Sequence, residues 1–350
     1  MRSPFFWRTK CQATTEPLAG KPVVAIVPVA QLEPAVTPVP AAAAQPPAMR
    51  QVYALALQDE RAIQPQIAPD PAQMSLLLAA SQAFAQIGTE PRYTPRRPAM
   101  LAQLLQALSD ENASLRELSR IVAKDPQLTG NLLRTANSVF YNTTGTPVES
   151  VERAAAMLGT AGIRRLLAAS LMQPLATGPA SEMGLFVEII WEHALYSASA
   201  SEAWVSHSQD ADPFIAHLLA LVHGLGCVAV YRVLTDLYAA RPELQRDPAT
   251  IADALETNAA VIASRIAAHW GLSVATQQAL ETQSSAAPNN EPSKLARALQ
   301  FGLLSGAMIM LCARGKLTEP AGLEGIEAGG FQGTASARIW ERLVRAYVRP

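Results

Sequence analysis

The chain has 350 residues, of which 49% are hydrophobic and 16% are charged, so it contains enough apolar material for a large buried core. Its formal net charge of -1 argues against a general electrostatic nucleic-acid binder, because such a protein needs a basic face to neutralise phosphates. The three cysteines are far apart and odd in number, which excludes a disulfide framework and favours a reducing, cytoplasmic compartment.

The first 70 residues are rich in proline and alanine. More than half of the 26 prolines lie before residue 99, and segments such as Pro38–Pro40 and Gln45–Pro47 cannot continue a helix or a central strand. Residues 1–70 are therefore expected to form a largely disordered tail, which serves either as a tether or as a simple spacer. Residues 71–92 are expected to hold a short helix and a linker.

From Ala99 onward, apolar residues recur at helical spacing, and no period-two alternation is long enough for a sheet. The clearest start is at Asp125, whose carboxylate can cap the first turn, followed by Pro126 at the first helical position. This helix extends to Tyr141. Further helices are predicted over 150–158, 163–171, 182–207, 213–231, 252–270, 274–282, 295–313 and 335–348, with 319–333 as a glycine-rich loop. The sequence therefore predicts an all-α protein.

The segment from Phe214 to Tyr231 carries no formal charge and is long enough for a membrane-spanning helix. Two histidines and two glycines interrupt it, and the flanking helices are amphipathic, so we expect a buried core helix and no membrane insertion. His223 in this helix and His193 in the preceding one both lie on inward-facing stripes. The two imidazoles are therefore expected to meet in the core.

Six blocks of the sequence together match a known pattern: Asp125–Ser138, Ala154–Gly159, Ile163–Leu166, Trp191–Ala194, Leu221–Gly226 and His269–Leu272. They resemble the HDOD domain, the HD-related output domain of bacterial signalling proteins. The resemblance implies a multi-helix bundle of the HD superfamily over residues 93–290. Residues 291–350 would then form a C-terminal helical extension that packs on this domain.

HD phosphohydrolases use a first histidine, an adjacent His-Asp pair and a later Asp to bind divalent ions. By the resemblance, His193 stands at the first position and His223 at the second, but the residue after His223 is Gly224, which has no ligand atom. Two imidazoles without a carboxylate suit Mg or Mn poorly, and zinc would need a further ligand. We expect vestigial positions, no catalytic residue, no metal and no cofactor.

The resemblance thus implies a non-catalytic regulatory module that acts through protein–protein interaction. Arg134, Asn137 and Tyr141, which lie close to the apolar face of the helix beginning at Asp125, are the candidate surface for a signalling partner. Nothing in the sequence decides whether the chain forms a homo-oligomer.

Two alternatives stay open. The first is a residual metal-dependent HD-type phosphohydrolase that acts on a nucleotide. The second is binding of a nucleotide second messenger without turnover, assisted by Arg92, Arg96 and Arg97, which lie between prolines.

Overall fold

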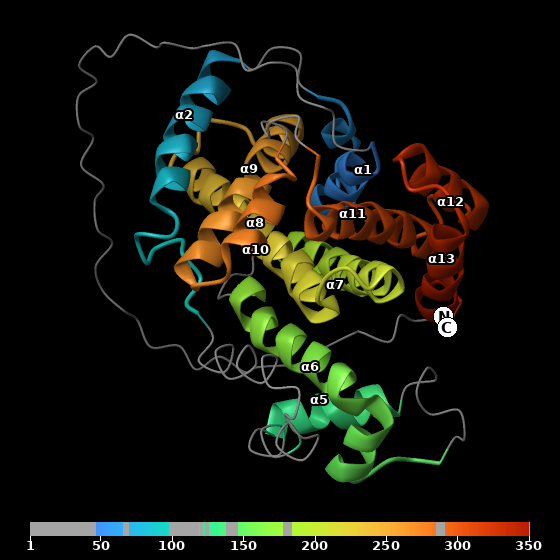
Figure 1. Ribbon diagram of the computed structural model, residues 1–350. Helices are drawn as coiled ribbons and strands as arrows, with labels where there is room; N and C mark the ends of the chain where they lie inside the picture. The colour runs from blue at the N-terminus through green and yellow to red at the C-terminus, as the bar shows by residue number, and fades with distance from the viewer. Residues whose placement is uncertain are drawn as a thin grey trace.

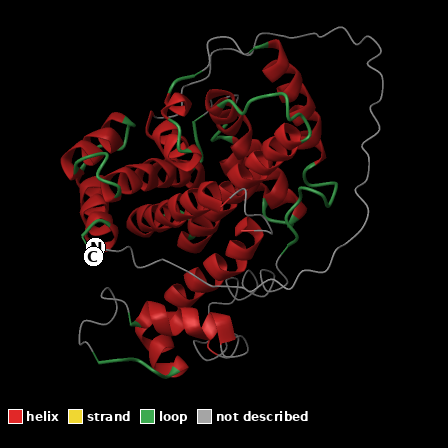
Figure 2. Ribbon diagram, turned by 180° about the vertical axis from the view of Figure 1, so that it is seen from behind, coloured by secondary structure: helices red, strands yellow, loops and turns green. Residues whose placement is uncertain are grey.

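The computed structural model describes residues 47–65, 70–97, 119, 122, 126–137, 146–177, 184–284 and 291–349. Within these residues every regular element is a helix and no strand occurs, as Figure 2 shows. This confirms the predicted all-α class. The elements are α1 (Pro47–Leu57), η1 (Glu60–Ile63), α2 (Pro71–Gln86), α5 (Pro126–Ala136), α6 (Val151–Thr177), α7 (Gly184–Ser208), α8 (Pro213–Ala239), α9 (Pro248–His269), α10 (Val274–Glu281), α11 (Lys294–Ala313), α12 (Glu319–Ala328) and α13 (Thr334–Tyr347).

The centre of the molecule is formed by α7, α8, α9 and α11 (Figure 1). α8 is apolar on nearly all sides, and most of its residues between Phe214 and Tyr238 are buried. A helix of this kind has to be surrounded by other helices, and α2, α6, α7, α9, α10 and α11 all pack against it. α8 is therefore the axis of the core.

The starts of the core helices follow capping signals in the sequence. The Asp212 carboxylate accepts hydrogen bonds from two backbone amides in the first turn of α8, where Pro213 occupies the position that needs no donor. Asp247 and Ser293 cap α9 and α11 in the same way. Short polar residues thus fix where α8, α9 and α11 begin.

Among the described residues, α8 and α11 are long and apolar enough to cross a membrane. Their most apolar windows are 94% and 78% buried inside the protein, respectively. Core helices of globular proteins share this composition, and both helices here lie in the packed centre.

The structure corrects the expected tail for residues 47–65, since α1 and η1 lie inside the range 1–70 that was predicted to be disordered. Met49, Val52, Tyr53 and Ala56 repeat at helical spacing and are buried against α7, α9 and α11. Proline is absent from α1 after Pro47, so the proline-rich composition of the surrounding sequence does not extend into this helix. Residues 1–46 lie outside the described residues.

The helix α5 and much of α6 form a smaller cluster of buried side chains, here called the α5–α6 lobe, which projects from the bundle in Figure 1. Leu128, Leu132, Leu158 and Leu167 belong to this cluster. The expected helix stop at Gly159 is a kink, because this glycine has φ of 68°, a conformation that other residues rarely adopt, and the helix then resumes. Asp125, expected as the cap of α5, lies outside the described residues.

The structure also corrects the loop expected over 319–333, because α12 occupies Glu319–Ala328. Its glycines serve close packing. A Cβ atom at Gly322 would lie 2.5 Å from the Trp340 ring, and one at Gly325 would lie 2.3 Å from the Met308 side chain. Glycine content alone was therefore a misleading loop signal here.

Candidate functional site

His193 of α7 and His223 of α8 are both buried, with exposed fractions of 2% and 3%. The His193 Nε2 atom lies 3.1 Å from the Leu303 carbonyl oxygen and 3.2 Å from the Ser197 hydroxyl. The His223 Nδ1 atom lies 4.0 Å from the Cys227 sulfur, whereas its Nε2 atom has no hydrogen-bond partner among the described residues. The two helices thus bring the histidines into one buried polar cluster.

Burial keeps both imidazoles neutral near pH 7. It lowers the pKa of His193 to about 4, against the opposing effect of the hydrogen bond with the Leu303 carbonyl. It lowers the pKa of His223 to about 3, and the neighbouring His193 lowers it further. The influence of His193 on His223 shows that the two rings are electrostatic neighbours.

The position after His223 has no room for a side chain. A Cβ atom at Gly224 would lie 2.7 Å from the Ala194 Cβ atom, and one at Gly226 would lie 2.3 Å from the Ala259 carbonyl oxygen. These glycines therefore set the close approach of α8 to α7 and to α9. An aspartate at position 224 would require the α7–α8 contact to open.

The carboxylate next to His193 in sequence is engaged elsewhere. Glu192 accepts a hydrogen bond of 2.5 Å from the Tyr196 hydroxyl and forms an ion pair with Arg314. Glu281 of α10 accepts a hydrogen bond from Ser264. Within the described residues, no group of three or more His, Cys, Asp or Glu side chains is arranged to hold a metal ion. The donor set around the two histidines does not fit a divalent ion.

The residues of the expected partner surface have different roles in the structure. Asn137 donates through Nδ2 to the Val148 and Leu133 carbonyl oxygens, and its Oδ1 accepts from the Val148 amide at 2.7 Å. Arg134 is exposed and donates to the Asn131 side chain at 3.2 Å. Tyr141 lies outside the described residues. The side chain of Asn137 therefore holds the α5–α6 lobe together, while Arg134 lies on its exposed side.

The three arginines between prolines lie near the ends of α8 and α9. Arg92 lies 3.5 Å from the Asp236 carboxylate, while Arg96 and Arg97 are exposed. Trp270 anchors this segment, because its indole nitrogen donates to the Pro95 carbonyl oxygen at 2.9 Å. The structure thus holds Arg92 against an acidic partner.

Sequence reasoning missed an ionic cluster that joins α6, α7 and α8. The Glu202 carboxylate lies 3.1 Å from the Arg165 Nε atom and 3.2 Å from the His217 Nδ1 atom. Arg165 lies between the apolar positions of its own helix, so the spacing within that helix gave no sign of a contact with the core. No pattern within one helix could have found a contact that depends on how three helices cross.

Comparisons with known proteins place this geometry in context. A family model described as the HDOD domain matches residues 94–286. A crystal structure of an HDOD domain protein with unknown function from Geobacter sulfurreducens matches with a TM-score of 0.52 and 15% identity, covering 78% of this chain and 95% of that one. No curated protein matches the chain.

Two further solved structures share the fold. A protein from Shewanella amazonensis SB2B, provisionally described as a phosphohydrolase, has a TM-score of 0.53 and 19% identity, with 77% of this chain and 95% of that one covered. A protein from Marinobacter aquaeolei VT8, provisionally described as a signal transduction protein, has a TM-score of 0.51 and 20% identity over 78% of this chain. The match spans 63% of the Marinobacter protein, less than two thirds of its length. These likenesses confirm the predicted HD-type helical fold.

Proposed function

The chain belongs to the HDOD domain family, and from this premise we propose that it is a regulatory signalling module without catalytic activity. The observation that carries the proposal is the state of the two histidines. Both imidazoles are buried and neutral, and the residue after His223 is a glycine packed against α7. An HD-type phosphohydrolase needs a divalent ion to activate water and hold the phosphate, and this donor set gives such an ion no suitable site.

A protein that signals without catalysis has to act through what it binds. We propose that the α5–α6 lobe contributes to the partner surface, with the exposed Arg134 as one of its residues. The lobe projects from the bundle in Figure 1, which supports this choice because a projecting lobe is accessible to a second protein. Cys227 and Cys312 are buried and free, in keeping with the cytoplasm as the proposed compartment.

The first experiment measures metal content and turnover. Full-length protein is incubated with Mn, Fe or Zn salts, desalted, and tested against a panel of nucleotides. We expect far less than one metal ion per chain and no hydrolysis above the buffer rate. Stoichiometric metal that disappears in the His223→Ala variant, but persists in a variant of the exposed His207, would overturn the proposal in favour of a phosphohydrolase.

The second experiment tests the partner surface. Proteins cross-linked to the wild-type chain in its own cells are compared with those cross-linked to Arg134→Glu. We expect at least one protein to be lost with Arg134→Glu and retained with Arg153→Glu, which changes an exposed arginine elsewhere on the lobe. Identical sets of cross-linked proteins for all three chains would show that Arg134 is not part of the partner surface.

Calorimetric titration with cyclic and linear nucleotides distinguishes a module that acts through protein partners from a receptor that binds a nucleotide second messenger. We expect no heat of binding. Saturable binding that is lost when Arg96 and Arg97 are replaced together would favour the receptor.

A further inference from the structure

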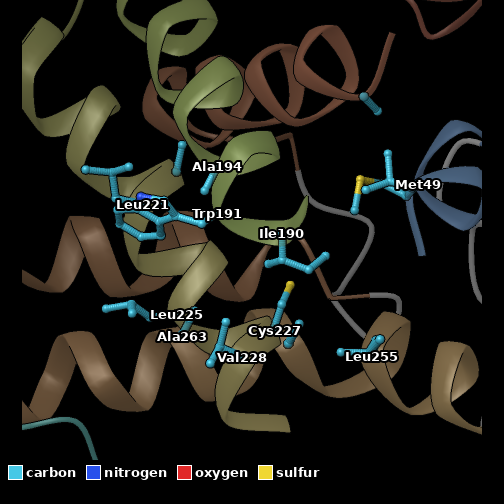
Figure 3. Packing of buried hydrophobic residues seen from close by; sticks show 14 of the residues in the cluster. Met49, Ile190, Trp191, Ala194, Leu221, Leu225, Cys227, Val228, Leu255 and Ala263 are labelled. Atoms are coloured by element: carbon cyan, nitrogen blue, oxygen red, sulfur yellow. The ribbon is translucent and has the colours of Figure 1, made fainter. Parts of the chain in front are cut away.

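The helix α1 lies outside residues 94–286, the part of the chain that matches the HDOD domain, yet it is packed into the core of that domain. It contacts α7, α9 and α11, and the faces of these three helices that it covers are here called the α1 docking face. Figure 3 shows Met49 of α1 in the same packed cluster as Ile190, Cys227 and Leu255 of the bundle. A helix outside the residues that match the family model thus packs against helices of the matched segment and against α11.

The way α1 binds is that of an amphipathic helix on a complementary surface. Met49, Val52, Tyr53 and Ala56 form one apolar face with spacings of three and four, and all four are buried. Arg50 supplies the charge, with its guanidinium paired to Asp253 and to Glu256 of α9, the latter at 2.5 Å. The docking face therefore recognises both an apolar stripe and one basic side chain.

Two features indicate that α1 binds its docking face less tightly than its buried area alone would suggest. α1 has only 11 residues, and an isolated helix of that length is marginal in water, so its order depends on the docking face. The Tyr53 hydroxyl is fully buried without a hydrogen bond of normal geometry, and the polar group beside it is the Cys227 thiol, a weak acceptor. A buried hydroxyl without a good partner lowers the affinity of the helix that carries it.

The contact also reaches the histidine pair. Cys227, beside Tyr53, has its sulfur 4.0 Å from His223 Nδ1. Displacement of α1 would expose this side of the buried cluster to a new occupant. The chain can open directly after η1, since Gln64 and Pro65 are exposed and outside any helix.

We propose that α1 is an exchangeable helix, and that the α1 docking face is a binding site for a partner's amphipathic helix carrying one basic residue. The inference rests on the proposed function and deepens it, because it names the kind of partner. In the resting chain α1 occupies the site, and a partner helix of the same pattern replaces it.

The experiment uses the full chain with a protease recognition sequence in place of residues 66–69. After cleavage, a fluorescent peptide of residues 46–65 is added in excess, and its anisotropy reports exchange with the cleaved segment. We expect exchange while the circular dichroism and thermal transition of the bundle persist. A cleaved segment that leaves only when the whole protein unfolds, or a bundle that unfolds on cleavage, would make α1 a permanent core element and overturn the proposal.

Variants of the peptide test which of its residues the α1 docking face recognises. Arg50→Glu should weaken binding on the order of tenfold, and Asp253→Lys with Glu256→Lys in the bundle should restore it. Arg61→Glu is the matched control, because Arg61 is exposed and pairs with Asp59 within the same peptide. Tyr53→Phe should bind about threefold more tightly, because it removes the poorly satisfied hydroxyl. Equal affinities for the Arg50→Glu and Arg61→Glu peptides would contradict the proposed recognition of a basic residue.

The two proposals can fail separately. Exchange together with a stoichiometric metal ion and nucleotide hydrolysis would refute the proposed function and leave the docking face intact. A permanently bound α1 in a metal-free, inactive protein would refute the proposed docking face and leave the proposed function intact.

Discussion

Gly224 of α8 lies so close to Ala194 of α7 that an added Cβ atom would stand 2.7 Å from the Ala194 Cβ, closer than such atoms approach in folded proteins. The position that would carry an aspartate in an HD enzyme is thus part of a helix–helix contact. We predict that Gly224→Ala lowers the free energy of unfolding by about 1–3 kcal/mol, as overpacking does, and that Gly224→Asp lowers it further without creating a metal site. Urea denaturation and metal analysis measure both effects.

Gly184→Ala is the matched control for this substitution, because a Cβ atom at Gly184 meets no atom within 4 Å. It should leave stability nearly unchanged. If Gly224→Asp were as stable as the wild type and bound one metal ion per chain, the packing role assigned to Gly224 would be wrong.

The buried histidines make stability depend on pH in a defined direction. Their pKa values fall from 6.5 to about 4 for His193 and about 3 for His223, so the unfolded chain takes up protons that the folded chain refuses. The stability they contribute is present above pH 6.5 and is lost as pH falls toward the folded pKa values. Between pH 7 and 5.5, we predict a combined loss of roughly 2 kcal/mol, measured by urea denaturation at the two pH values.

Replacement of His193 and His223 by glutamine should flatten this pH dependence even where it lowers stability at both pH values. His207→Gln removes an exposed histidine at the end of α7 and serves as the comparison. A pH dependence that persists unchanged in the double variant would mean that other groups cause it.

A substitution of Asn137 tests whether the polar residue that follows α5 serves the fold or a partner. Its side chain satisfies the amide and the carbonyl of Val148, which is 2% exposed, so Asn137→Ala leaves buried backbone groups unpaired. We predict a loss of about 1–3 kcal/mol in thermal or chemical unfolding. Arg134→Glu, on the exposed side of the same helix, should leave stability nearly unchanged. The opposite ranking of the two variants would place Asn137, rather than Arg134, on a binding surface.

The ion pair between Glu202 and Arg165 should hold the second part of α6 against the core. We predict that Glu202→Gln lowers the free energy of local opening in α6 by about 1 kcal/mol, a modest value because Arg165 is 38% exposed. Amide hydrogen exchange should show faster exchange in α6 and no change in α9. Glu188→Gln, at an exposed position of α7, is the control, and equal exchange in both variants would remove Glu202 from this role.

Much of the fold was predictable because helices leave periodic signals in the sequence. The apolar spacing located α8 and α11, and the inward stripe placed His193 in the core. The same reasoning failed for α1, where a helical stripe follows a proline-rich stretch, and for α12, where glycines pack rather than turn. In both places, the proline or glycine content of the surrounding segment led to a wrong prediction of its secondary structure.

The candidate site was predictable only in part. The sequence could place two histidines on facing stripes and note the missing aspartate after His223. It could not show that Gly224 fills a contact with Ala194, or that Glu202 meets Arg165 and His217, because these depend on the distances between helices. A contact between two helices leaves no periodic pattern in the sequence of either helix.

The location of α1 has a consequence for how the newly made chain folds. Arg50 and its partner Glu256 are separated by 206 positions, and α11, which completes the docking face, begins only at Lys294. At ordinary rates of synthesis, α1 emerges from the ribosome on the order of ten seconds or more before its binding surface is complete. During that interval its apolar face is open to chaperones and to neighbouring nascent chains.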